Sequence, residues 1–326
     1  MKILFIFTGG TIGCTVSEGI ADTNYSIIKD IAALCTAEKE NIFEYASPFT
    51  MLSENSGCET LSALCTFMLS VDYNKYDGVI VTHGSDTLAY SAALLGQVLS
   101  WVKIPVVITA ANYVIDDPRS NARDNLLASY RLISDFSERK NKYSGVFAVW
   151  KNPGASAEIY PAIHLLEADA FDRFGSWGNI SVGKTDDNGD EIHHDESLSF
   201  LRGRKITLMN NVLFLHSYPG MDYRNINLEG KEAVLLKLYH SGTACMEGER
   251  TAFNYLSEMC KNSNVDLYIT PTKSGSYHYR SEEGFKGSRA IPIAGISEIA
   301  AYTALLLAYS LEDNEKYVIM KHIGIL

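Results

Sequence analysis

The stretch MKILFIFTGGTIGC, residues 1–14, decides how the rest of the chain is interpreted. Aliphatic and aromatic residues fill positions 3–7 and give way at once to glycines, which is typical of a buried strand ending in a tight loop. Ligands of open α/β sheets bind at the carboxyl ends of such strands. Glycine lets the backbone approach a ligand closely, and Thr8 and Thr11 supply hydroxyl groups there. Read alone, the stretch suits a binding loop and a purely architectural turn equally well.

Two familiar phosphate-binding loops do not fit this stretch. A dinucleotide fingerprint requires G-x-G-x-x-G, and Thr11 breaks that pattern. A P-loop requires Gly-Lys-Ser or Gly-Lys-Thr, which does not occur here. The glycine loop therefore needs a partner elsewhere in the chain.

Length and composition describe a globular chain with a full core. The 326 residues are 46% hydrophobic and 21% charged, which allows two domains of ordinary size. A net charge of −11 with scattered Lys and Arg argues against nucleic acid or an anionic membrane as the main partner. The sequence lacks a signal-peptide pattern and a long apolar span, and its six dispersed cysteines suit reduced thiols rather than a zinc site. We expect a cytoplasmic protein.

Strands and helices alternate, which predicts an α/β fold with parallel βαβ units. We expect a larger N-terminal domain over residues 1–183, in which helices flank a mainly parallel sheet. A polar linker or hairpin over 184–210, with His193 and His194, precedes a smaller α/β domain over 211–326. Strands are expected at 3–7, 77–82, 105–109, 145–150, 211–216, 233–239 and 265–270. Helices are expected at 24–37, 57–71, 86–99, 119–136, 249–260 and 297–309, the last with Ser297 as its N-cap.

A second strand ends as the first one does, in the sequence VTHGSDT at residues 81–87. Ser85 or Asp86 alone could simply cap the following helix. If the two strands are neighbours, however, Thr11, Ser85 and Asp86 converge at one edge of the sheet. A carboxylate, hydroxyls and helix N–H groups together suit a zwitterion, because they match its ammonium and carboxylate groups. His83 is expected to pack behind the loop.

TGGTIG at residues 8–13 and YDGVIVTHGSDT at 76–87 resemble the two signatures of the bacterial-type L-asparaginase family. The resemblance implies a cofactor-free amidohydrolase that hydrolyses L-asparagine to L-aspartate and ammonia. A threonine hydroxyl attacks the side-chain amide and forms an acyl-enzyme, while backbone N–H groups stabilise the oxyanion.

Matched position by position, the resemblance assigns Thr11 as nucleophile and Tyr25 as the residue that activates it. It assigns Ser53 to the substrate carboxylate and Asp86 to the ammonium, and places Ser85 where the family has a second threonine. The implied catalytic residues are Thr11, Tyr25, Ser85 and Asp86. The implied substrate-binding residues are Gly10, Ser53, Glu54, Gly84, Ser85 and Asp86.

The sequence departs from the family where a catalytic lysine is usual. Alignment places Leu165 at that position, with His164 beside it, and leucine cannot accept a proton. His164 is one possible substitute base, Lys151 is another, and loss of the usual mechanism is the third reading. Asn121 and the sequence TAAN at 109–112 also depart from the family pattern.

The resemblance further implies a homodimer or homotetramer in which Ser241 and Glu283, or the adjacent Glu282, reach a neighbouring subunit's site. Three alternatives remain open: an amidase for glutamine or a modified asparagine, an ammonia-supplying component of a tRNA-linked amidotransferase, and a non-catalytic amino-acid sensor. The amidotransferase component carries an extra N-terminal domain, whereas the first strand here begins at residue 3.

Overall fold

The computed structural model describes residues 1–17, 20–23, 41–139, 144–182, 195–272 and 279–325. The chain divides into two compact units, Met1–Thr207 and Leu208–Leu326, each with its own sheet. Residues 195–207, part of the expected linker, belong to the first unit, where the 3₁₀ turn η6 (Glu196–Leu201) buries Leu198 and Leu201. His193 and His194 lie outside the described residues.

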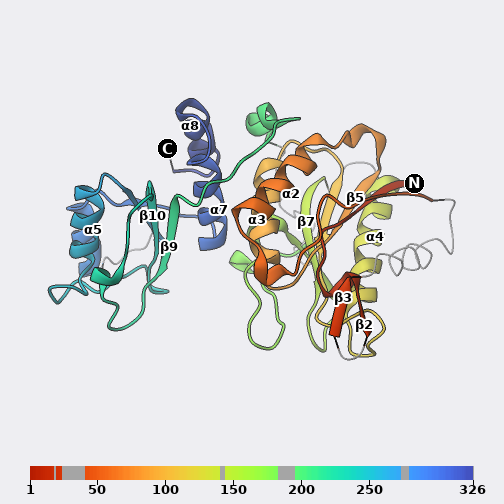
Figure 1. Cartoon of the computed structure of the whole chain (residues 1–326), viewed down its shortest axis with the longest axis horizontal. Helices are drawn as coiled ribbons and strands as arrows, with labels where there is room; N and C mark the ends of the chain where they lie inside the picture. The colour runs from red at the N-terminus through yellow and green to blue at the C-terminus, as the bar shows by residue number, and fades with distance from the viewer. Residues whose placement is uncertain (18–19, 24–40, 140–143, 183–194, 273–278, 326) are drawn as a thin grey trace. The chain divides into compact units, whose positions relative to one another are not determined.

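The first unit is built on a six-stranded sheet in the order β4-β1-β5-β6-β7-β8, in which only β8 runs antiparallel to its neighbour (Figure 1). A separate antiparallel pair, β2 (Cys14–Ser17) and β3 (Ile20–Thr23), follows the glycine loop. The strands of the large sheet are β1 (Lys2–Phe7), β4 (Ile42–Ala46), β5 (Gly78–Thr82), β6 (Pro105–Thr109), β7 (Gly145–Lys151) and β8 (Ala157–Pro161).

The strands β4 and β8 were not predicted from the sequence, and both lie at the edges of the sheet. Most of their side chains are half-buried or exposed, so neither strand shows the continuous apolar run that identified the central strands. The central strands match the prediction within a residue or two, because all or nearly all of their side chains are buried.

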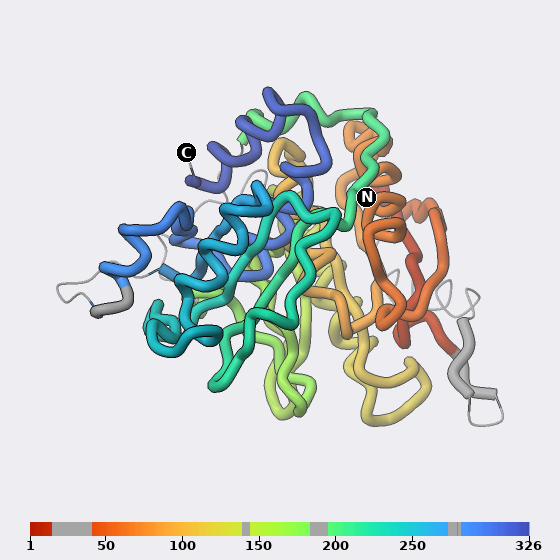
Figure 2. Tube along the Cα trace, turned by 60° about the vertical axis from the view of Figure 1, so that its left-hand side comes forward, coloured from red at the N-terminus to blue at the C-terminus, as the bar shows by residue number. Residues whose placement is uncertain are grey.

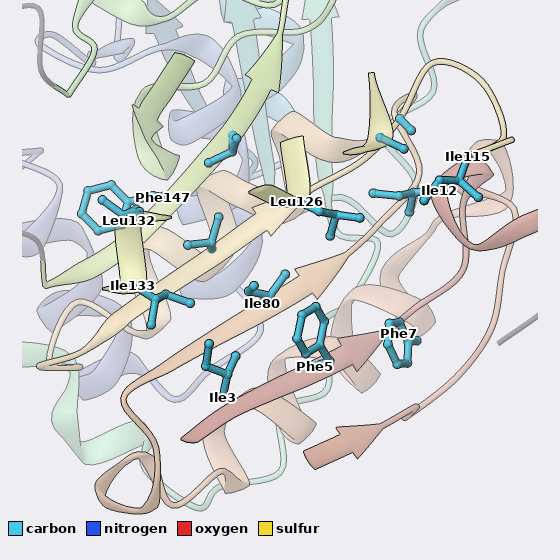
Figure 3. Close-up of a cluster of buried hydrophobic side chains, with 14 residues drawn as sticks. Ile3, Phe5, Phe7, Ile12, Ile80, Ile115, Leu126, Leu132, Ile133 and Phe147 are labelled. Carbon is cyan, nitrogen blue, oxygen red and sulfur yellow. The ribbon is translucent and has the colours of Figure 1, made fainter. Parts of the chain in front are cut away.

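Helices cover both faces of this sheet: α2 (Cys58–Ser70) and α3 (Leu88–Val98) on one side, and α4 (Ala122–Arg139) on the other (Figure 1). Every second residue of β1 points to the α4 side, as the pleat requires. A buried cluster forms there (Figure 3), and its labelled members are Ile3, Phe5, Phe7, Ile12, Ile80, Ile115, Leu126, Leu132, Ile133 and Phe147.

The second unit, coloured green to blue along the trace in Figure 2, contains a four-stranded parallel sheet in the order β12-β11-β10-β9. Ser297 caps α7 as predicted, because its side chain accepts a hydrogen bond from the Ala300 N–H at 3.1 Å. No helix in the described ranges is both long enough and apolar enough to cross a membrane. The elements are β9 (Val212–His216), β10 (Ala233–Lys237), α5 (Phe253–Asn262), β11 (Asp266–Thr270), α6 (Arg280–Lys286), β12 (Ile291–Pro292), α7 (Glu298–Ala308) and α8 (Asp313–His322).

Gly78 lets α4 approach β5 closely, and this contact gives a test of the core. A Cβ at Gly78 would lie 2.6 Å from three side-chain carbons of the fully buried Ile133. We expect Gly78→Ala to lower the free energy of unfolding by about 1–3 kcal/mol through overpacking, measured by denaturant titration. Because Ile133→Ala removes those carbons, Gly78→Ala should lower the free energy of unfolding much less in the Ile133→Ala variant. An equal cost in both backgrounds would contradict this account.

Candidate active site

Three loops meet at the carboxyl edge of the first sheet, because β1 lies between β4 and β5. The Met51 N–H, in the loop after β4, donates to the Thr8 carbonyl at 3.1 Å. The Gly10 N–H donates back to the Met51 carbonyl at 3.3 Å, and the Thr8 N–H donates to the Thr82 carbonyl at 3.2 Å. The loops after β1, β4 and β5 therefore form one hydrogen-bonded assembly.

Glycines allow these backbones to touch. Gly10 has a φ of +79°, and a Cβ there would lie 2.3 Å from the His83 carbonyl oxygen and 2.5 Å from the Gly84 Cα. A Cβ at Gly84 would lie 2.3 Å from the Ser53 Oγ. Any larger residue at either position would push the loops apart, so glycine is required by both conformation and space at Gly10 and by space at Gly84.

Thr11 and Ser85 are next to this contact, since each directly follows one of the touching glycines. Thr11 begins the 3₁₀ turn η1 (Thr11–Gly13) and is half-buried, as is Ser85. Ile12 is 1% exposed and belongs to the core cluster (Figure 3). The core thus anchors the loop one residue after the hydroxyl that the sequence predicts to be the nucleophile.

A hydrogen bond between side chains joins the second and third loops. The Ser53 Oγ donates to Asp86 Oδ2 at 2.8 Å, and the Thr87 Oγ1 donates to the Ser53 carbonyl at 3.2 Å. Ser53 is buried while Asp86 is exposed. The buried Ser53 hydroxyl therefore orients a carboxylate that a ligand can reach from solvent. This arrangement suits an ammonium group. Glu54 is also exposed, next to Ser53 on the turn η2 (Ser53–Asn55).

Thr8 differs from the expectation that both loop threonines present hydroxyls to a ligand. Its side chain is 1% exposed and its Oγ1 donates to the Thr82 carbonyl at 2.9 Å. Cys14 is likewise buried, and its thiol donates to the Gly10 carbonyl at 3.2 Å. Both groups hold the loop in place. In the part of the chain that the structure describes, no cluster of three His, Cys, Asp or Glu side chains could hold a metal ion.

His83 supports the third loop from behind, as the sequence predicts. Its ring is fully buried, with Nδ1 at 2.8 Å from the Gly84 carbonyl and Nε2 at 3.0 Å from the Ser91 Oγ. A carbonyl only accepts hydrogen bonds, so Nδ1 carries the proton and Nε2 accepts from the Ser91 hydroxyl. Burial lowers the pKa of His83, which keeps the ring in this neutral form.

Asparagines connect the end of β6 to β7. Asn112 and Asn121 exchange hydrogen bonds, each backbone N–H donating to the other's Oδ1 at 3.1 Å. Asn121 also donates to the Lys151 carbonyl at 3.0 Å. These two residues are among the positions where the sequence departs from the family pattern, and these two departures form one reciprocal pair.

Of the other residues considered for catalysis, His164 and Leu165 lie away from the three loops. Tyr25 falls outside the described residues. His164 ends the 3₁₀ turn η4 (Ala162–His164), whose Ile163 packs against Gly96 in the carboxyl-terminal half of α3. Burial lowers the pKa of His164, and its Nδ1 has no hydrogen-bond partner among the described residues. Leu165 is fully buried.

Ser241 and Glu283 belong to the second unit. Ser241 lies 3.0 Å from Thr243, Oγ to Oγ1, in the turn after β10. Glu283 is on α6, where its carboxylate pairs with Lys286 at 3.0 Å.

The neutral state of His83 predicts how stability depends on pH. The unfolded chain takes up a proton near pH 6.5, whereas the folded chain does so only at lower pH. The contribution of His83 to the free energy of unfolding is therefore fully present above about pH 6.5 and decreases as the pH falls below that value. We expect His83→Leu to lower it by about 1–3 kcal/mol at pH 8, because Gly84 and Ser91 lose their partner. The difference from wild type should shrink towards pH 5; a constant difference would contradict a buried neutral ring.

Comparison with known proteins places these features in a family context. The family model described as "Asparaginase, N-terminal" matches residues 2–197. An L-asparaginase from Thermococcus kodakarensis is 25% identical over 94% of this chain and 92% of its own length. A glutamyl-tRNA(Gln) amidotransferase subunit from Methanosarcina mazei is 26% identical over 70% of this chain, which spans only 57% of that relative.

The fold is shared with solved structures. The thermostable L-asparaginase from Thermococcus kodakarensis superposes with a TM-score of 0.74 at 20% identity, covering 99% of this chain and 98% of that one.

Proposed function

Since this chain belongs to the asparaginase family, we propose that it hydrolyses the side-chain amide of L-asparagine and that Thr11 is its nucleophile. One observation carries the proposal: the buried Ser53 orients the exposed Asp86 carboxylate at 2.8 Å, beside the Gly10–Gly84 contact that Thr11 and Ser85 flank. In this proposal the Asp86 carboxylate binds the substrate ammonium, and the Thr11 and Ser85 hydroxyls face the side-chain amide.

The reaction follows from these groups. The Thr11 hydroxyl loses its proton and attacks the amide carbon, and the tetrahedral oxyanion is stabilised by backbone N–H groups of the loops. The amide nitrogen takes up the proton lost by Thr11, the C–N bond breaks and ammonia leaves. The product is an ester between Thr11 and the aspartyl group. Water then attacks this ester, releasing L-aspartate and restoring the hydroxyl.

Two backbone features support stabilisation of the oxyanion. The Gly84 carbonyl is held by His83 on the buried side of the loop at 2.8 Å. Because a peptide group is planar and trans, the N–H of the next residue, Ser85, points away from that carbonyl. We propose this N–H as an oxyanion donor.

Replacing Thr11 tests the nucleophile directly. Thr11→Val keeps the shape of the side chain but removes its hydroxyl, so ammonia release from asparagine should fall about 10³-fold or more. Thr11→Ser keeps a hydroxyl and serves as the matched control, which should retain measurable turnover. Steady-state ammonia assays on asparagine and glutamine measure both, and circular dichroism checks the fold. Wild-type turnover in Thr11→Val would refute the assignment.

Tyr25, His164 and Lys151 are the candidates for the group that accepts the Thr11 proton, and His164 can be tested directly. Because Ile163 packs against Gly96 far along α3 from the site, we expect His164→Ala to retain near wild-type kcat. If His164 is instead the base, the variant should lose about 10²-fold in kcat. Wild-type activity would then persist below pH 6.5 and decline only through the lowered pKa of His164. The pH dependence of kcat in both proteins distinguishes these outcomes.

A second candidate is ammonia supply to a tRNA-linked amidotransferase, favoured by the similarity to the amidotransferase subunit from Methanosarcina mazei. Hydrolysis of glutamine or of a modified asparagine uses the same nucleophile. Comparing kcat/KM for asparagine and glutamine in the same ammonia assay separates these substrates. If asparagine binds without turnover in the wild type, the chain is a sensor rather than an enzyme.

We also propose a cytoplasmic homodimer or homotetramer in which Ser241 and Glu283 complete a neighbouring subunit's site. The turn that holds Ser241 is short and hydrogen-bonded, so its hydroxyls have fixed positions. Glu283 is exposed on α6 and can reach a partner.

A further inference from the structure

A cavity of about 460 Å³ lies apart from the three loops, between α4 and the hairpin of β7 and β8. In the sheet order, β6 separates β5 from β7, so the cavity lies at least two strand spacings, about 10 Å, beyond the loop that holds Ser85 and Asp86. This volume suits a small molecule. Nothing in the proposed hydrolysis uses it.

The floor of the cavity is apolar and incompletely covered. Leu127 on α4, Ile159 on β8 and Val182 line it, and all three are only half-buried. The Val182 N–H donates to the Ile159 carbonyl at 2.7 Å, which fixes this wall against the edge strand. An apolar ligand group placed here would remove these side chains from water.

Two opposite charges stand at the rim. Arg131 and Asp135 both line the cavity from α4, one helical turn apart. Among the residues that the structure describes, neither side chain has a hydrogen bond or ion pair, and both are exposed. The other charged pair in the lining is different: Lys151 and Asp124 are joined at 2.6 Å.

We propose that this cavity binds the zwitterion of an L-α-amino acid with an apolar side chain of about leucine size. The Arg131 guanidinium holds the α-carboxylate, the Asp135 carboxylate holds the α-ammonium, and the side chain covers Leu127 and Ile159. Residues four apart on a helix are surface neighbours, and their spacing of about 5–6 Å matches the two adjacent charges of an amino acid. Such a ligand carries no side-chain amide, so it is not a substrate for the proposed hydrolysis.

Hydrogen bonds connect the cavity wall to the loop at the end of β6. The Lys151 N–H donates to Asn125 Oδ1 at 2.7 Å, and Asn125 Nδ2 donates to the Ala110 carbonyl at 2.9 Å. The neighbouring Thr109 carbonyl accepts from the His83 N–H at 2.8 Å. Because Lys151 lines the cavity, a ligand bound there lies next to groups that are hydrogen-bonded to the third loop, and its binding is expected to change substrate affinity.

The test is isothermal titration calorimetry on the full chain with L-leucine, N-acetyl-L-leucine and L-leucinamide. We expect leucine to bind once per chain, Arg131→Met to weaken binding at least tenfold, and Asp135→Asn to do the same. N-acetyl-L-leucine lacks the ammonium and leucinamide the carboxylate, so each should bind weakly to the wild type. Arg123→Met, an exposed arginine on α4 outside the cavity lining, is the matched control and should bind as wild type does.

Three results would overturn the proposal. These are no leucine binding at millimolar concentration, equal binding by wild type and Arg131→Met, and a change of oligomeric state in Arg131→Met seen by size-exclusion chromatography. The last would identify this face as a contact between copies of the chain. Because binding is measured by heat, these results do not depend on whether Thr11 is the nucleophile.

Discussion

The close approach of Gly10 to the backbone of His83 and Gly84 is the constraint on which the first unit's site depends. At 2.3 Å from a carbonyl oxygen, no Cβ can be accommodated, so the backbones of the loops after β1 and β5 are in direct contact at Gly10. That contact exists because β1 and β5 are neighbouring parallel strands whose carboxyl ends share one edge. The flanking residues, Thr11 and Ser85, then have little freedom in where they lie.

The buried and the exposed polar groups of the three loops have different roles. Thr8, Cys14 and His83 are buried; Thr8 and Cys14 donate to backbone carbonyls, and His83 bonds to the Gly84 carbonyl and Ser91, so these contacts hold the loops together. Asp86, by contrast, is exposed and oriented by one buried hydroxyl. Rigid support beneath an accessible carboxylate is the arrangement that binding a zwitterion requires, since the charge is positioned before the ligand arrives.

The carboxyl ends of β6 and β7 show how two departures from a family pattern can compensate for each other. Asn112 and Asn121 each depart from the family pattern, yet they satisfy each other's backbone N–H groups. Through Asn121 and Asn125 the same network reaches the backbone of Lys151, whose ammonium is paired with Asp124. Lys151 therefore belongs to the α4–β7 surface.

The sequence by itself determined the alternation of strands and helices, the two signature loops and the N-cap at Ser297, because these depend on neighbours within a few residues. It predicted the central strands well, since strands buried on both faces are continuously apolar. It could not identify the edge strands β4 and β8, whose half-exposed side chains lack that pattern. Local composition treats Thr8 and Thr11 alike, as two hydroxyls three residues apart, and only the family resemblance singled out Thr11. Only the tertiary structure decided that Thr8 donates to the Thr82 carbonyl, that Ser53 meets Asp86 across 33 positions, and that Ile163, the residue before His164, packs against Gly96 of α3. These outcomes depend on the order of the strands in the sheet and on which polar groups are buried. Neither can be read from the spacing of residues that are close in sequence.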